Sequence, residues 1–287
     1  MSDASIQHFY DESTGTLSYV VWDQQGGYAA VVDPVVGYSM VSGRIDTGPS
    51  DVVVEFILKN KLNLEWILET HAHADHLTGA QYIKSKLGGT VAIGEGIRDV
   101  QAHFGPVFDL GASFALDGSQ FDRLFADGDI FHIGKFECEV IRTPGHTSDG
   151  VSYKVGSAVF VGDSMFMPDF GTARCDFPGG DAGLLYDSIE RILSLPAETR
   201  LLMCHDYKPD GRELRWECTV AEQREENIHV NAKVTKAEFT SMRDERDASL
   251  GLPALIVPAI QVNIRAGHLP DAADNGIVYI KTPVDTL

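Results

Sequence analysis

A dense cluster of side chains that can bind metal lies between Thr70 and Gly79. Three histidines and one aspartate fall within six positions of this segment: His71, His73, Asp75 and His76. Neutral imidazole and carboxylate groups are good ligands for borderline divalent metals, and proteins rarely crowd so many titratable groups together for packing. The segment therefore predicts a metal site rather than a polar loop with surface histidines.

Three more metal-binding side chains follow apolar segments later in the chain, and each lies beside turn residues. They are His146 in Thr143-Pro-Gly-His-Thr147, Asp163 in Gly162-Asp163 and His205 in Cys204-His-Asp-Tyr207. Residues so far apart in sequence can converge only if the fold brings the strand ends together, as α/β folds do. One such residue alone would be weak evidence, whereas the ordered series predicts one site built from several strand ends.

Short apolar runs bounded by turn residues precede these side chains and predict strands. The strands that lead to the candidate ligands are expected at 64–69, 136–142, 158–161 and 201–203. Helices are expected at about 77–87 and 181–194, with a charged helix at 219–239. The segment 37–49 reads as a loop, followed by a helix that Ser50 caps. This alternation predicts an α/β fold with two sheets packed together and helices outside.

Length, net charge and cysteine content restrict the possible domain organisation, partners and location of the protein. The chain can bury one large core and no linker divides it, so we expect a single domain over 1–287 with a C-terminal helical extension and tail from about 215. A net charge of −19 repels phosphate backbones and anionic lipids, which argues against nucleic acid and membrane partners. Residues 1–8 do not read as a signal peptide, and no run approaches the ~20 apolar residues that span a bilayer. Four cysteines without a C-x-x-C pair fit reduced thiols, so a cytoplasmic location is predicted.

The ordered motifs resemble those of the metallo-β-lactamase superfamily over most of the chain, and within it most closely those of the persulfide dioxygenases. The resemblance implies an αβ/βα sandwich. The segments that carry it are Asp33–Val35, Thr70–Gly79, Thr143–Thr147, Phe160–Ser164, Ala173–Phe177 and Cys204–Tyr207, and it continues to Pro258, Asn263, Arg265 and Gly267. Ala-Arg-Cys-Asp-Phe and His-Asp-Tyr are the more selective parts, because H-x-H-x-D-H fits any hydrolase of the superfamily.

The resemblance implies one non-haem iron(II) per chain. In that family the metal is bound by the residues that match His71, His146 and Asp163 here. Two histidines and one carboxylate leave positions open for substrate and dioxygen. The other site residues would then orient the ligands and bond to metal-bound water: His73, Asp75, His76 and His205. The same residues could instead hold two zinc ions with Asp163 bridging, and the sequence does not decide between these arrangements.

The family reaction oxidises the outer sulfur of glutathione persulfide with dioxygen to sulfite and releases glutathione. The resemblance thus predicts an enzyme whose substrate carries two carboxylates. Arg174 matches the family's substrate-contacting arginine, and Tyr207 matches the tyrosine beside the site histidine. Asn263 and Arg265 are further candidates for substrate binding.

Purely structural roles are the alternatives to these assignments. Arg174 could form a structural ion pair with Asp169 or Asp176, and Tyr207 could be a core tyrosine. Extra segments that look like loops near the mouth of the site lie at 37–50, 98–122 and 207–215. The histidines that match no motif read as surface or core residues: His8, His103, His132, His229 and His268.

Rival functions use the same residues. A hydrolase of glutathione thiolesters, of the glyoxalase II kind, would use two metals and a bridging hydroxide. A non-catalytic sulfur-binding or sensing protein comes from a different class, and the intact ligand set argues against it. A β-lactam hydrolase, a flavodiiron reductase and a nuclease fit less well. The sequence is compatible with a homodimer, and no feature compels one.

Overall fold

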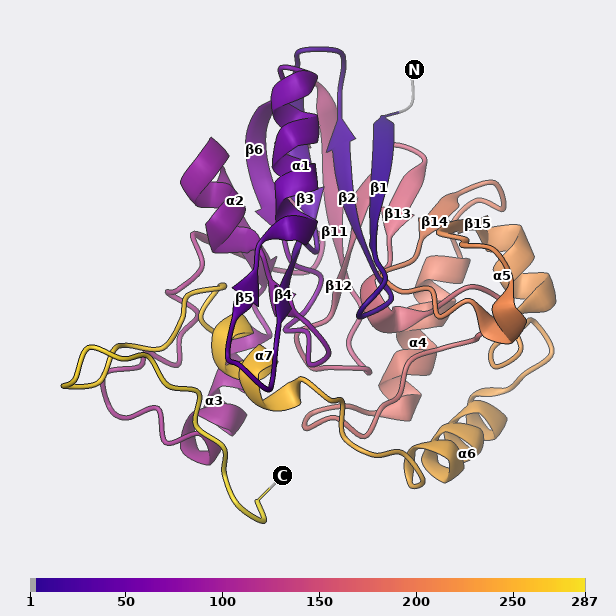
Figure 1. Cartoon of the computed structure of the whole chain (residues 1–287). Coiled ribbons are helices and arrows are strands. Elements are labelled where there is room, and N and C mark those ends of the chain that lie inside the picture. Colours follow the sequence, from indigo (N-terminus) through magenta and orange to yellow (C-terminus); the bar gives the residue numbers. More distant parts are fainter. Residues whose placement is uncertain (1–3, 287) are drawn as a thin grey trace.

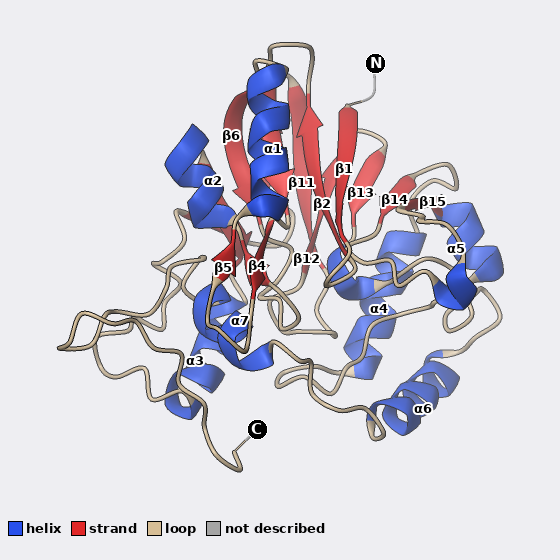
Figure 2. Cartoon of the chain, viewed as in Figure 1, coloured by secondary structure: helices blue, strands red, loops and turns tan. Residues whose placement is uncertain are grey.

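Two six-stranded β-sheets face each other at the centre of the molecule, and helices cover the outer face of each sheet (Figure 1). The structure is a computed structural model and describes residues 4–286. The four layers follow the order helices, sheet, sheet, helices, which confirms the predicted αβ/βα sandwich (Figure 2). The prediction that residues 1–8 are not a signal peptide falls partly outside the described residues, because residues 1–3 are not among them.

The first sheet has the strand order β1-β2-β3-β6-β8-β9. Its strands are β1 (Ser5–Asp11), β2 (Thr16–Trp22), β3 (Tyr28–Val32), β6 (Asn63–Leu68), β8 (Thr90–Gly94) and β9 (Arg123–Phe125). From β3 to β9 they run parallel, so their C-terminal ends meet at one edge. The helices on its outer face are α1 (Gly48–Lys59), α2 (Ala80–Leu87), α3 (Ile97–Val107) and α7 (Ile256–Asn263).

The second sheet has the strand order β10-β11-β12-β13-β14-β15. Its strands are β10 (Ile130–Ile133), β11 (Phe136–Arg142), β12 (Val151–Val155), β13 (Ala158–Phe160), β14 (Arg200–Leu202) and β15 (Glu217–Thr219). Helices α4 (Ala182–Leu193), α5 (Val220–Glu226) and α6 (Lys236–Asp247) lie on its outer side (Figure 1).

Alternating side chains along the strands build three apolar layers. In β3, Val31 packs toward α1 and α3, while Val32 faces the space between the sheets. In β14, Leu201 packs toward α4 and α6, while Leu202 joins the same central layer. Because alternate side chains point to opposite faces, each sheet is packed on both sides. This packing fixes the positions of the strand ends from which the site loops begin.

The segment 37–49 is more ordered than predicted. It includes the end of strand β4 (Val35–Tyr38) and all of strand β5 (Ile45–Asp46), and these two strands form a small sheet with β7 (Leu77–Thr78). Helix α1 begins at Gly48 after Thr47, and not at the expected cap Ser50, whose hydroxyl donates to the carbonyl of Val35 instead. Pairing between β4 and β7 joins residues about forty positions apart, and no local pattern reports it.

The predicted helix at 219–239 is wrong in its middle. Helix α5 ends at Glu226, and α6 begins only at Lys236, after a capping box formed by Thr235 and Glu238. Between them, Asn227 interrupts the helix because its amide bonds to the carbonyl of Gly171 and to backbone N–H groups just after it.

The region expected as a tail begins with a packed helix. Helix α7 places Ile256 and Ile260 in the core beside α1 and α3, and Val262 against Leu77. This part of the extension belongs to the core of the sandwich. Within residues 4–286, no helix is both long and apolar enough to cross a membrane.

Candidate metal centre

The candidate ligands meet where the strands of the two sheets end. His71 follows β6, His146 follows β11, and His205 follows β14. Asp163 lies in the short 3₁₀ turn Gly162–Ser164 after β13. Four segments far apart in sequence therefore supply one site, as the ordered motifs predict.

His71, His146 and Asp163 form one compact group, in which the candidate ligand atoms all lie within 4.8 Å of one another. Asp163 Oδ2 lies 3.8 Å from His71 Nε2 and 3.7 Å from His146 Nε2. These distances are too long for hydrogen bonds and suit atoms that surround a common ion.

A chain of hydrogen bonds fixes the orientation of His71. The hydroxyl of Thr70 donates to Asp33 Oδ2 at 2.9 Å, so its oxygen is left to accept from Nδ1–H of His71 at 3.1 Å. The opposite ring nitrogen, Nε2, then carries the lone pair and has no hydrogen-bond partner among the described residues. Burial holds the pKa of His71 well below its usual range, which keeps this lone pair unprotonated.

A backbone carbonyl orients His146. Its Nδ1 lies 2.7 Å from the carbonyl oxygen of Arg174, which can only accept, so Nδ1 carries the hydrogen and Nε2 faces Asp163. Gly145 makes this turn possible, because its φ is +136° and a Cβ there would lie 2.3 Å from the backbone of Leu185 in α4. The P-G-H-T turn thus requires glycine for close packing against the helix.

A second group contains His73, Asp75, His76 and His205, whose ligand atoms also lie within 4.8 Å of one another. His205 Nε2 is 3.2 Å from Asp75 Oδ2, and His76 Nδ1 is 3.3 Å from Asp75 Oδ1. Although burial alone would raise it, His205 and His76 hold the pKa of Asp75 well below its usual range. The buried hydroxyl of Thr16 lies within 3.4 Å of Nδ1 of both histidines.

His73 turns its Nε2 away from the first group, toward Asp33 Oδ1 at 3.1 Å. Its Nδ1 is buried without a hydrogen-bond partner among the described residues. Burial lowers the pKa of His73 strongly, so the ring is neutral and the lone pair of Nδ1 can bind a cation.

The donor set fits a bound cation. Several buried nitrogen and oxygen atoms of the two groups make no hydrogen bond within the described part of the chain: His71 Nε2, His73 Nδ1, Asp75 Oδ2, His76 Nε2, Asp163 Oδ1 and His205 Nε2. A buried polar atom without a hydrogen bond costs folding free energy. In each group here, candidate ligand atoms lie within 4.8 Å of one another. Asp163 lies between the groups, with Oδ1 only 3.4 Å from His205 Nε2. One metal fits the first group, and a second fits the other.

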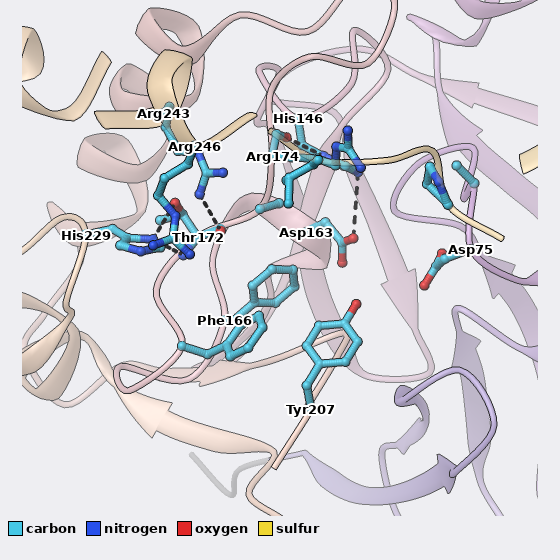
Figure 3. Close-up of a pocket in the computed structure, with 15 residues that line it drawn as sticks. Asp75, His146, Asp163, Phe166, Thr172, Arg174, Tyr207, His229, Arg243 and Arg246 are labelled. Carbon is cyan, nitrogen blue, oxygen red and sulfur yellow. Dashed lines mark hydrogen bonds and ion pairs between the residues drawn. The ribbon is translucent and has the colours of Figure 1, made fainter. Parts of the chain in front are cut away.

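A pocket of about 270 Å³ opens beside the metal centre (Figure 3). Asp75, His146 and Asp163 line one end, and His229 and two arginines line the other. Phe166 and Phe170 form an apolar wall between the ends. The pocket can therefore hold an elongated ligand with one end against the metal.

Tyr207 lies on this wall and is not a core residue, since 45% of its surface is exposed. Its ring is parallel to that of His205, with a centroid distance of 5.6 Å, and also contacts Phe170. Arg212 holds the loop behind it by paired bonds to Asp206 and Asp169. Of the three expected mouth loops, only 207–215 supplies a pocket residue; none of 37–50 or 98–122 lines the pocket.

Arg174 lines the pocket with its guanidinium already engaged. Nε and Nη2 donate to the two oxygens of Asp176 at 2.5 and 2.6 Å, and Nη1 donates to the carbonyl of Gly251 at 2.6 Å. The structure therefore realises the ion-pair alternative with Asp176, while Asp169 pairs with Arg212.

Asn263 and Arg265 do not line the pocket, so substrate contact by them is not supported by the geometry. The Asn263 amide donates to the carbonyls of His73 and His76, both at 2.8 Å, and accepts from Thr78 N at 2.9 Å. It thus holds the ligand loop itself. The Arg265 guanidinium lies 4.4 Å from the centre of the Phe114 ring.

Several residues of the site carry no signal in the sequence. Thr16 touches His76 and His205, yet a single threonine at that position matches no metal motif. His229, Arg243 and Arg246 line the pocket from the segment after residue 205, where the sequence suggested only a charged helix and an unassigned histidine. The spacing of the two arginines is a signal that could have found them. Arg243 and Arg246 are three residues apart, so they lie on one face of a helix.

Comparison with known proteins agrees with this geometry. The family model of the metallo-β-lactamase superfamily matches residues 13–205. A probable metallo-hydrolase of Burkholderia pseudomallei is 46% identical over 99% of this chain and 100% of its own length. Glyoxylase B2 of Dictyostelium discoideum is 48% identical, over 99% of this chain and 98% of its own. The human mitochondrial persulfide dioxygenase is more distant, at 27% identity over 91% of this chain and 88% of its own.

Among solved structures, ETHE1 from Myxococcus xanthus superposes with a TM-score of 0.73 and 28% identity, covering 92% of this chain and all of that one. The shared fold, the matched motifs and the converging histidine and aspartate side chains agree with one another. The chain therefore belongs to the metallo-β-lactamase superfamily.

Proposed function

We propose that this protein is an iron-dependent dioxygenase that oxidises the terminal sulfur of glutathione persulfide to sulfite. The observation that carries the proposal is the compact group of His71, His146 and Asp163 beside an open pocket. Two histidines and one carboxylate on one face are typical of non-haem iron(II) sites that keep positions open for other ligands. His73 lies in the other group, which leaves the first with three protein donors.

A ferrous ion bound by these residues would supply a redox-active centre that can take up a sulfur anion and dioxygen. The overall reaction is RSSH + O₂ + H₂O → RSH + SO₃²⁻ + 2H⁺, in which sulfur loses four electrons, in forming sulfite and thiol, and dioxygen gains them. The protein's own residues position the reactants. The carbonyl of Arg174 and the hydroxyl of Thr70 keep His146 and His71 in the ligand orientation.

The pocket walls suit a glutathione derivative. Phe166, Phe170 and Tyr207 cover the sulfur end with aromatic surface and keep bulk water away from it. Arginines at the far end provide positive charge for carboxylates on a protein whose net charge is −19. The similarity to the human persulfide dioxygenase adds support at the level of the family.

A hydrolase of glutathione thiolesters with two metals is the second candidate. The observation that favours it is the position of Asp163, whose Oδ2 faces His71 and His146 while Oδ1 faces His205. A carboxylate between two complete ligand groups suits a bridge between two metals that activate water. The resemblance to glyoxylase B2 of Dictyostelium points in the same direction.

Metal counting and two activity assays on the same purified sample separate the candidates. The dioxygenase is supported by about one iron per chain, oxygen uptake with glutathione persulfide and slow cleavage of S-lactoylglutathione. Two zinc ions per chain with rapid thiolester cleavage, and no oxygen uptake after reloading with iron, would favour the hydrolase instead.

We also propose that the protein works in the cytoplasm with reduced thiols. The four cysteines, Cys138, Cys175, Cys204 and Cys218, are buried and unpaired. Burial raises the pKa of Cys138, Cys175 and Cys218 to about 12, which makes them poor nucleophiles at neutral pH.

A further inference from the structure

Most of the far end of the pocket is built from the segment after residue 226. Figure 3 shows His229, Thr172, Arg243 and Arg246 grouped at the side of the pocket opposite Asp75 and Asp163. Arg243 and Arg246 are one turn apart on α6, so both can reach the same face. This end lies where the part of a substrate remote from its sulfur would bind.

Arg174 is poorly suited to bind a substrate carboxylate, even though it matches the family's substrate-contacting position. Three of its guanidinium nitrogens already bond to Asp176 and Gly251. Three of its five N–H groups are thus used, and Asp176 already neutralises its charge, so a carboxylate would bind there more weakly than at an arginine without an acidic partner. The arginine thus ties the loop at Gly251 to the pocket wall.

Arg243 is also committed to the structure. Its side chain is buried, with 3% exposed, and pairs with Asp247 of the same helix. It also donates to the carbonyl of Thr172, and Asp247 accepts from the backbone N–H of Cys175. This pair fixes α6 against the pocket wall, one turn before Arg246.

Arg246 differs from both. It is exposed and lines the pocket, and its guanidinium makes no ion pair or hydrogen bond with any residue in 4–286. The chain has 42 acidic and only 23 basic side chains, so an arginine without an acidic partner at the end of a pocket stands out. A planar guanidinium is well suited to bind a carboxylate through two hydrogen bonds.

His229 supplies a neutral donor beside Arg246. The N–H of Thr172 donates to its Nδ1 at 3.0 Å, so the hydrogen of the neutral ring is on Nε2. Burial, with Arg243 and Arg246 nearby, lowers the pKa of His229 to about 4. Gly171 makes this close approach possible, since a Cβ there would lie 2.2 Å from Nδ1.

We infer that Arg246, assisted by Nε2–H of His229, binds a carboxylate of the thiol carrier, and that it takes this role in place of Arg174. The inference rests on the proposed function for the identity of the substrate, a carboxylate-bearing peptide thiol. Arg246 is then a residue that determines specificity, while the metal end determines the chemistry. The same contact would serve a persulfide or a thiolester of glutathione.

The test measures equilibrium binding of S-methylglutathione, which cannot react, to iron-loaded protein by calorimetry. The dissociation constant of Arg246→Gln is expected to rise by about 10- to 100-fold, as for loss of a charge-assisted contact. Arg224→Gln is the matched control, because Arg224 is an exposed arginine on α5 outside the pocket and its loss changes the net charge equally.

The diethyl ester of S-methylglutathione identifies the group that is bound. Wild-type protein should bind the ester about 10- to 100-fold more weakly than the free acid, and Arg246→Gln should bind both alike. Arg174→Gln should keep the wild-type preference for the free acid. The inference is overturned if Arg246→Gln retains that preference, or if Arg174→Gln alone loses it.

Steady-state assays separate this inference from the proposed function. With glutathione persulfide, Arg246→Gln should raise KM with little change in kcat. If wild-type protein consumes no oxygen but binds S-methylglutathione through Arg246, the proposed dioxygenase fails and the binding assignment stands. If oxygen uptake is normal and the KM of Arg246→Gln equals that of the wild type, the binding assignment fails alone.

Discussion

The two ends of the pocket are built in different ways. At the metal end, candidate ligands follow strands of the central sheets, and all of them lie within residues 13–205 that the superfamily model matches. At the arginine end, His229, Arg243 and Arg246 come from the helical segment beyond residue 205. The shared sandwich thus holds the candidate metal ligands, while a later segment supplies most of the arginine end of the pocket.

The ends also differ in rigidity. His71 and His146 are each held by a hydrogen bond to a residue that is itself fixed, Thr70 in one case and the Arg174 carbonyl in the other. Arg246 has no such support and lies exposed. The candidate metal ligands are therefore held in one orientation, whereas no described residue holds the guanidinium of Arg246.

The largest effect is expected from removing a candidate metal ligand. His146→Ala should lower iron affinity and oxygen uptake together by more than about 100-fold, since even loss of a residue that only orients a ligand costs 10- to 100-fold. The metal content and the activity of the same sample provide the measurement, and Arg246→Gln should keep its full metal content. A His146→Ala protein with normal iron content and activity would contradict the assigned triad.

The next largest effect tests whether the arginine end depends on a buried scaffold. Arg243→Met should lower the free energy of unfolding by about 3–5 kcal/mol, because Asp247 would remain buried without its partner. Urea unfolding measures this. Lys236→Met is the control, as its exposed pair with Asp187 should contribute about 0–1 kcal/mol. Equal effects of the two variants would show that the buried pair is not the scaffold.

A somewhat smaller effect is expected at the connection between the C-terminal helix and the metal end. Asn263→Ala would leave the carbonyls of His73 and His76 without the amide that binds them. We expect a loss of about 2–4 kcal/mol in the free energy of unfolding and about 10-fold weaker metal binding. Asn275→Ala, at an exposed position, should change neither quantity. If Asn263→Ala loses stability but binds metal normally, the loop does not need this support.

The smallest effect concerns His229 and the pH dependence of stability. Its pKa is about 4 in the folded protein and about 6.5 when unfolded, so the unfolded chain binds more protons between these values. Stability should therefore fall as pH drops from about 6.5 toward 4, by about 1 kcal/mol after allowance for solvent screening. Urea midpoints at pH 7 and pH 5 measure this, and His229→Asn should flatten the difference. An identical pH slope in both proteins would assign the acid sensitivity to other groups.

Much of the metal end could be predicted from the sequence, because its signals are local. The H-x-H-x-D-H segment, the P-G-H-T turn and the strands before them are each visible within a few residues. Their convergence follows from the rule that strand ends gather at one edge of a sheet. Whether His73 joins the first group depends on the bond from its Nε2 to Asp33, which no spacing reports.

The arginine end could not be predicted for the opposite reason. Asn227 breaks the expected helix by bonding to Gly171, a contact between residues 56 positions apart. The inward position of Arg243 depends on that break and on packing of α6 against α4. The same lack of long-range information made Asn263 look like a substrate residue, although its amide holds the ligand loop.

The most direct test of the central claim is the ratio of dioxygen consumed to sulfite formed, measured with iron-loaded protein and glutathione persulfide. One dioxygen should be consumed per sulfite, with one glutathione released and no turnover in His146→Ala. Sulfur release without oxygen uptake, accompanied by rapid hydrolysis of S-lactoylglutathione, would contradict that claim.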